Sequence, residues 1–380
     1  MSNILSEIIN DEYTEFLFDE YCFGEPNEAN TADDVEKGIE LALSLENRNV
    51  FLEGLAERLT ELGVRCNADD TDIMLAEMKS RYKRILNKFC PKTVINWVKG
   101  ITPPGITNRE NNYDVCCALE MDYMQTAVFF QKHFLTVPYN SKSMTDAVYL
   151  YCIYHNKPYS MVSYLLNNAK ILIPRTQVHT STSQISRNII NIDNDDEFLA
   201  YLSKHYYSEE LHFLHAKDII IKEIADVKER IQNDTAITKV TDDRLNSLTV
   251  AALIGYKSQA KREDKPRRKL PKHFTGSLPN DVTIGQILRG EKVSYEVLRK
   301  MLMLLRFNNF YSEAVNENEN DVCINLLDFK DELNKTLLSC GFAQIYMRHP
   351  FDCLLMYCAN SYDPIQTLHF INDPEKNPDL

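Results

Sequence analysis

The sequence predicts an all-α protein made of two related helical modules, with at most one short β element in a central polar linker. Apolar residues recur every three or four positions through most of the chain, which is the period of an amphipathic helix. Only eleven of the 380 residues are glycine, and no glycine-rich phosphate-binding pattern is present, so nucleotide-binding α/β folds are not indicated. A short pattern that ends in a basic residue and a glycine occurs twice, which predicts the two modules.

Each predicted helix has its own apolar stripe and its own stop signal. The first, over residues 50–64, ends at Gly63, and the second, over 72–89, ends before Pro91. The apolar side of the second should be formed by Ile73, Met78, Tyr82, Ile85 and Phe89. Similar patterns predict helices over 92–100, 111–121, 122–134, 143–156, 158–172, 196–206, 210–233, 243–259, 282–290 and 291–307.

Charge is distributed unevenly along the chain, although the net charge is −13. Residues 1–40 hold twelve carboxylates and one lysine. Residues 78–100 hold seven basic residues and no carboxylate, and residues 257–273 hold eight basic residues against two acidic ones. Because local charge decides where a polyanion binds, the acidic total does not exclude nucleic acid.

The two copies of the repeated pattern are Thr93–Gly100, TVINWVKG, and Thr283–Gly290, TIGQILRG. A second pair of matching blocks follows in the same order, DAVYLYC at 146–152 and DCLLMYC at 352–358. The offset between copies grows from 190 to 206, so we expect an insertion in the second copy, near the acidic stretch NENENDV. This order favours an internal duplication over a chance match of helical composition.

The blocks at 146–152 and 352–358 both start with an acidic residue near the expected beginning of a helix. Ser143 with Asp146 suggests a capping arrangement, and His349, Pro350 and Asp352 suggest a helix start with proline in the first turn. The carboxylates would then lie near the positive end of the helix dipole.

The pattern of hydroxyl, apolar, bulky and basic residues closing on glycine resembles the Cro/repressor (XRE-type) helix-turn-helix. The paired arrangement also resembles uncharacterised proteins of anaerobic Firmicutes with duplicated, degenerate helix-turn-helix units. The resemblance covers about fifty residues per copy and implies that 92–99 and 282–289 are recognition helices. It implies a bacterial, DNA-binding, transcription-regulating protein.

The expected DNA-binding residues follow from placing each short helix in the roughly 12 Å wide major groove, with the basic residues on phosphates. In the first copy they are Lys79, Arg81, Lys83, Arg84, Lys92, Thr93, Asn96 and Lys99. In the second they are Arg267, Arg268, Lys269, Thr283, Gln286 and Arg289. Asp281 and Gly285 weaken the second copy, because a carboxylate repels phosphates and glycine weakens a helix. Trp97 is expected to pack in the core.

The sequence therefore predicts a non-enzymatic, regulatory protein that binds double-stranded DNA through its first module. The alternative is a protein-interaction scaffold whose helix-turn-helix units serve only for packing. We expect no cofactor and no metal, since the ten cysteines form no C-x-x-C pair and the helix with His205, Glu209, His212 and His215 lacks an H-E-x-x-H order. No leader and no run near 18 apolar residues is present, which predicts a cytoplasmic protein with reduced thiols.

The predicted organisation has five parts. They are an acidic arm (1–40), a first helical module (41–173), a polar linker (174–196), a central helical segment (197–256) and a second helical module (257–380). We hypothesise that the acidic arm competes with DNA for the basic stretch 78–100, against the simpler interpretation of a solubilising helix.

Overall fold

The computed structural model describes residues 32–104, 108–174, 182–207, 211–234, 270, 276–314 and 322–372. In these residues the chain forms sixteen α-helices and no sheet strand, which confirms the all-α prediction. No helix in these ranges is both long and apolar enough to cross a bilayer. The chain divides into two compact units, unit 1 and unit 2, each described by itself.

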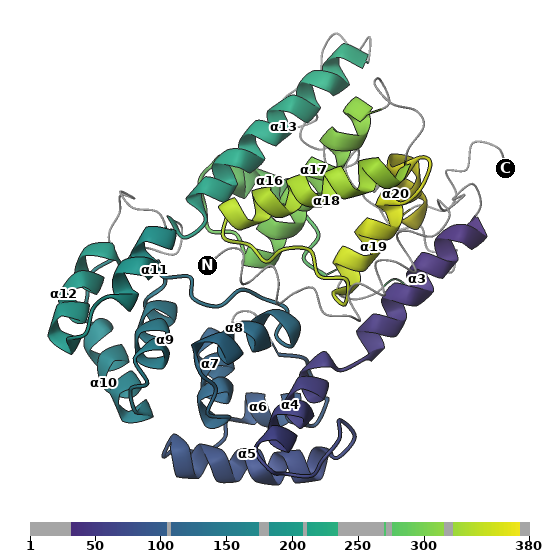
Figure 1. Cartoon of the computed structure of the whole chain (residues 1–380). Helices are drawn as coiled ribbons and strands as arrows, with labels where there is room; N and C mark the ends of the chain where they lie inside the picture. Colours follow the sequence, from purple (N-terminus) through teal and green to yellow (C-terminus); the bar gives the residue numbers. More distant parts are fainter. Residues whose placement is uncertain are drawn as a thin grey trace. The chain divides into compact units, whose positions relative to one another are not determined.

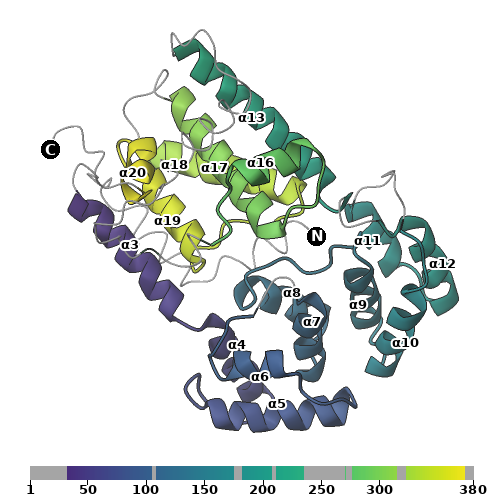
Figure 2. The ribbon, with the colours of Figure 1, turned by 180° about the vertical axis from the view of Figure 1, so that it is seen from behind.

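Unit 1 contains residues 49–212. Its helices are α4 (Val50–Glu61), α5 (Thr71–Ile85), α6 (Lys92–Val98), α7 (Arg109–Ala118), α8 (Tyr123–Lys132), α9 (Met144–Tyr154), α10 (Tyr159–Ala169), α11 (Thr182–Ile190) and α12 (Asp195–His205). Helices α4, α5 and α6 pack against one another, as Figures 1 and 2 both show. Trp97 of α6 is 1% exposed and packs on Phe51 and Phe134, so its predicted core role is confirmed.

Unit 2 combines the described residues from 213 onward with residues 32–48, which precede unit 1 in the sequence. Its helices are α3 (Ala32–Asn47), α13 (Leu214–Asp234), α16 (Asp281–Leu288), α17 (Tyr295–Ala314), α18 (Val322–Ser339), α19 (Pro350–Ala359) and α20 (Pro364–Asn372). Helix α13 packs along α17, and α3 packs against α19 and α20. In both views α3 lies beside α19 (Figure 1, Figure 2).

The division of the chain differs from the five predicted parts. Residues 32–40, assigned to the acidic arm, belong to α3, which contributes Val35 and Ile39 to the core of unit 2. Residues 182–190, assigned to the polar linker with its short β element, form α11, because Ile185 and Ile189 are four positions apart and both buried. The predicted central segment is divided between the units, at His212 and Phe213. Residues 1–31 and the predicted helix 243–259 lie outside the described residues.

Each unit contains a buried ion pair between an arginine and an aspartate, in matching positions. Arg109 and Arg299 each come nine residues after the glycine that follows the short helix, Gly100 or Gly290. Arg109 binds Asp146 on α9 through both Nε and Nη2. Arg299 binds Asp352 on α19 through Nη1 and Nη2, at 2.8 and 2.7 Å.

The surroundings of the two aspartates also match. Each accepts a third hydrogen bond from the backbone N–H six residues earlier, from Asn140 at 2.7 Å and from Tyr346 at 3.0 Å. Both aspartates are fully buried. Ser143 and His349 are the N-cap residues of α9 and α19, but neither makes a side-chain cap, and both aspartates bind arginine. The capping role expected of Asp146 is therefore replaced by an ion pair that joins two helices.

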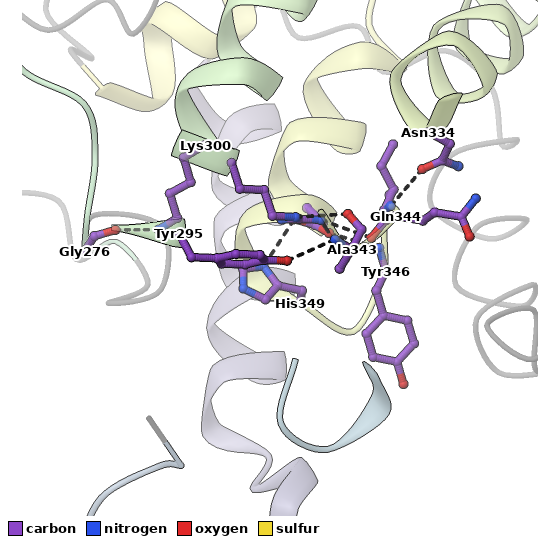
Figure 3. A network of polar contacts seen from close by, with 11 residues as sticks. Gly276, Tyr295, Lys300, Asn334, Ala343, Gln344, Tyr346 and His349 are labelled. Carbon is purple, nitrogen blue, oxygen red and sulfur yellow. Dashed lines mark hydrogen bonds and ion pairs between the residues drawn. The ribbon is translucent and has the colours of Figure 1, made fainter. Parts of the chain in front are cut away.

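In unit 2 the ion pair is the centre of a larger polar network (Figure 3). Arg299 also donates to the carbonyls of Ala343 and Gln344, both at 3.1 Å. Beside it, the buried Lys300 ammonium donates to the Gly276 carbonyl and lies over the Phe351 ring, 5.0 Å from its centroid. Burial lowers the pKa of Lys300 to about 8. The network joins α17 to the segment that leads into α19.

Replacing Asp352 should strongly destabilise the protein. Asp352→Asn removes the charge but keeps the size, and it leaves the Arg299 guanidinium buried without a counter-charge. We expect the free energy of unfolding in urea to fall by about 3–5 kcal/mol. Asp328→Asn, at an exposed position of α18, is the control and should change stability by less than about 0.5 kcal/mol. Equal effects of the two changes would contradict the prediction.

The contribution of Asp352 should depend on pH. Burial by itself would raise its pKa, but Arg299 and the His349 ring outweigh burial and hold the pKa well below its usual range. A carboxyl with a lowered folded-state pKa stabilises the protein above its unfolded pKa of about 3.9 and loses this contribution as pH falls. The stability difference between wild type and Asp352→Asn should therefore shrink as pH falls from about 5 to 2. Urea unfolding of both proteins at a series of pH values measures this stability difference. A difference that stays constant with pH would refute the prediction.

Candidate nucleic-acid interface

Helix α6 has one polar face and one buried face. Lys92, Asn96 and Lys99 are four and three positions apart, so they lie along the same side of the helix. The two lysines are exposed, and Asn96 and Thr93 are half-buried. Three apolar side chains face the core: Val94, Trp97 and Val98. The four residues predicted on this helix therefore remain accessible, and its apolar positions attach it to α4 and α5.

The end of α6 requires glycine. Gly100 has a φ of +66° and donates its N–H to the Trp97 carbonyl, and the Ile101 N–H bonds to the Asn96 carbonyl at 2.9 Å. In α16, Gly290 has a φ of +73° and forms the same two bonds, to Ile287 and from Glu291 to Gln286. These bonds are those of a Schellman motif, in which the left-handed residue is most often glycine. The closing glycine of both repeats thus has one structural cause.

Three of the basic residues predicted on α5 are exposed: Lys79, Lys83 and Arg84. Arg81 is different, because it occupies a core position and is only 4% exposed. Its Nε lies 2.9 Å from Glu77 and its Nη1 lies 2.9 Å from Glu120. Arg81 lies seven positions after Met74 and three after Met78, on the buried stripe of the helix. The predicted phosphate contact is therefore corrected to a structural role that attaches α5 to the end of α7.

The turn between α5 and α6 also differs from the prediction. Helix α5 ends at Ile85, because Asn87 takes a left-handed backbone conformation with a φ of +52°. The Lys88 N–H bonds to the Tyr82 carbonyl and closes the helix end at 3.2 Å. Phe89 is thus not on the apolar side of a helix but in the turn, where its side chain is 93% exposed. Ile73, at the other end of the expected stripe, is 46% exposed.

Lys88 points in the opposite direction, into unit 1. Its ammonium pairs with the buried carboxylate of Asp114 on α7 and donates to the Tyr159 hydroxyl at 2.8 Å. The Tyr149 and Tyr159 hydroxyls donate to the other oxygen of Asp114, at 2.7 and 2.6 Å. Burial raises the pKa of both tyrosines, and Asp114 raises it further, so both hydroxyls keep their protons and act as donors. This cluster attaches the turn before α6 to three other helices.

Five cations remain on the surface formed by α5 and α6, which we call the α5–α6 surface. They are Lys79, Lys83, Arg84, Lys92 and Lys99, and none of them has an ion-pair partner among the residues that the structure describes. The chain has no carboxylate between Met78 and Arg109. The α5–α6 surface therefore has an uncompensated positive charge, which is the electrostatic requirement for contacting phosphates.

In unit 2, the described residues of α16 and its C-terminal cap carry no cation without an ion-pair partner. Arg289 is exposed but pairs with Glu291, at 2.6 Å. Thr283 forms a capping box with Asn280, so its hydroxyl is already bonded, and Gln286 is half-buried. Val282, 68% exposed, stands where unit 1 has Lys92. The other predicted contacts, Arg267, Arg268 and Lys269, lie outside the described residues.

The sequence did not indicate two features of this surface, the inward cluster around Asp114 and the outward position of Phe89. A single lysine in a basic run gives no sign that it is paired with a carboxylate 26 residues later. The one local signal was Asn87, since asparagine is the commonest residue after glycine to end a helix in the left-handed conformation.

Comparison of the chain with known protein families, curated proteins and solved structures finds no match in any of the three.

Replacing Lys88 should loosen the turn before α6. Lys88→Met removes the cation from Asp114 and leaves that carboxylate with its two tyrosine donors. We expect the free energy of unfolding to fall by about 1–3 kcal/mol and amide exchange across residues 86–91 to accelerate. Lys83→Met, five residues earlier on the exposed side of α5, should leave both quantities nearly unchanged. Equal changes in the two variants would show that Lys88 does not hold the turn.

Proposed function

We propose that unit 1 binds double-stranded DNA, without catalysis, through the α5–α6 surface. The observation that carries the proposal is the group of five exposed cations on two helices that pack together, α5 and α6, none with an ion-pair partner among the described residues. Cations that have no partner in the protein can neutralise phosphates and displace the counterions of DNA. This displacement provides most of the affinity of non-specific DNA binding. Arg81 is not part of the proposed contact set.

The polar face of α6 supports base contacts in addition to phosphate contacts. Lys92, Thr93 and Asn96 carry the amine, hydroxyl and amide groups that recognise base edges in the major groove. They project from a helix fixed by Trp97 on one side and by the Asp114 cluster at its N-terminal end. This arrangement agrees with the recognition helix implied by the resemblance to Cro/repressor proteins. A regulatory role is proposed on the same resemblance. A cytoplasmic location is proposed because the cysteines of the described residues are free thiols.

We further propose that the two units arose by duplication and that the second lost its DNA contacts. Thr93 and Arg109 match Thr283 and Arg299 at one offset, 190. Asp146 and Asp352 each accept two bonds from the arginine and one from the backbone N–H six residues earlier. The growth of the offset occurs between Arg299 and Tyr346, and the predicted insertion at 316–322 lies almost wholly outside the described residues. The surface of α16 carries Asp281, Val282 and Leu288, all exposed. This face is partly apolar and its described residues carry no unpaired cation, which favours a protein partner for unit 2.

Removing the exposed cations should weaken DNA binding and reduce its dependence on salt. We expect the triple variant Lys79→Ala/Lys83→Ala/Arg84→Ala to bind random-sequence duplex DNA less tightly than wild type. The slope of log affinity against log salt should decrease by about one for each phosphate contact removed. Fluorescence anisotropy over a salt series measures both.

The matched control removes the same charge from other helices of unit 1. Lys170, Arg187 and Lys204, on or beside α10, α11 and α12, are exposed, so their triple replacement by alanine tests net charge alone. Equal weakening by the two triple variants would reject the α5–α6 surface as the binding site. Absence of binding by folded wild type at low salt would reject DNA binding and favour the scaffold alternative.

A further inference from the structure

Phe89 is the most exposed large apolar side chain among the residues that the structure describes, at 93%. It lies in the turn between α5 and α6, directly after Lys88 and three positions before Lys92. A phenylalanine in this position contributes almost nothing to the hydrophobic core, because its ring remains in water. Its position next to the proposed recognition helix suggests that its partner is the molecule that binds there.

The backbone around Phe89 is fixed on both sides. Leu86 is 4% exposed, and the Lys88 ammonium is bound to Asp114 and lies 5.2 Å from the centroid of the Tyr159 ring. Pro91 has an extended backbone and begins α6 as its N-cap residue. With the residues before and after it anchored, the turn presents the Phe89 ring outward from a defined position. A preformed aromatic surface loses little conformational entropy when a ligand stacks on it.

The charges around Phe89 determine the class of ligand. The turn joins the two helices that carry the five unpaired cations of the α5–α6 surface, and no carboxylate lies between Met78 and Arg109. An exposed aromatic side chain in a turn between two cation-bearing helices fits the way in which proteins bind nucleic acids with accessible bases: cations contact the backbone, and the ring stacks on a base. In an intact duplex both faces of each base are covered by its neighbours, so stacking requires a base that has left the helix or a step that has opened.

We propose that Phe89 stacks on an unpaired base, so that unit 1 prefers duplex DNA with a bulged base to the same duplex fully paired. This inference rests on the proposed function, because the cations must first bring the DNA backbone to α6. Phe89 then acts as a specificity-determining residue: it contributes to the complex with the bulged duplex and little to the complex with the paired one.

The experiment compares two short labelled duplexes of the same random sequence, one fully paired and one with a single bulged adenine. Fluorescence anisotropy gives the affinity of the full-length chain for each. We expect wild type to prefer the bulged duplex by about 5- to 100-fold, the range expected for stacking on one base. Phe89→Leu, which keeps an apolar side chain but removes the ring, should lose this preference and retain the affinity for the paired duplex.

Phe89→Trp tests stacking directly, because indole also stacks on bases. Trp97 is the only native tryptophan and is buried, so the new residue reports from the surface. We expect this variant to keep the preference and its emission to be quenched by the bulged duplex more than by the paired one. Ile173→Ala, at an 83% exposed position after α10, is the control for loss of an exposed apolar side chain and should leave the preference unchanged.

The outcomes separate this inference from the proposed function. If wild type binds both duplexes equally, or Phe89→Leu keeps the preference, the stacking role is overturned and DNA binding by the cations stands. If wild type binds neither duplex at low salt, the proposed function fails and the stacking role fails with it. In that case Phe89 is left as an apolar contact for a protein partner.

Discussion

The rest of each unit depends on one buried ion pair between an arginine and an aspartate. A charge removed from water is strongly destabilising unless its partner is correctly placed, so each pair requires two helices to meet in one arrangement. In unit 1 the pair joins α7 to α9, and in unit 2 it joins α17 to α19. The short helices have other anchors: α6 packs against α4 and α5, and α16 packs against α13.

The two units show how a common framework can carry different surfaces. Both short helices bury their apolar residues, end in the same glycine motif and precede the same arginine. On the outside they differ: unit 1 has unpaired lysines where unit 2 has Val282 and an arginine neutralised by Glu291. Packing constrains the inward residues to similar types, whereas the outward residues are free to change with the binding partner.

The turn between α5 and α6 illustrates how a buried polar group can organise a surface. Asp114 is a carboxylate in the core of unit 1, and three donors satisfy it: Lys88, Tyr149 and Tyr159. Lys88 therefore points into unit 1 and is not available on the surface, whereas the next residue, Phe89, is exposed. The same interaction thus lowers the number of available cations and exposes an aromatic ring next to α6.

The sequence by itself determined the helical class, the boundaries of most helices, the packing of Trp97 and the location of the basic stretch. These properties follow from periodicity, helix stop signals and local composition, which act over a few residues. Only the tertiary structure decided that Arg81 and Lys88 are internal, that Phe89 is exposed, that Asp146 and Asp352 bind arginines and that α3 belongs to unit 2. Those outcomes depend on partners distant in the chain, such as Arg81 with Glu120 and Arg299 with Asp352. A charged side chain is placed by the counter-charge that it meets on folding, and no local pattern contains that information.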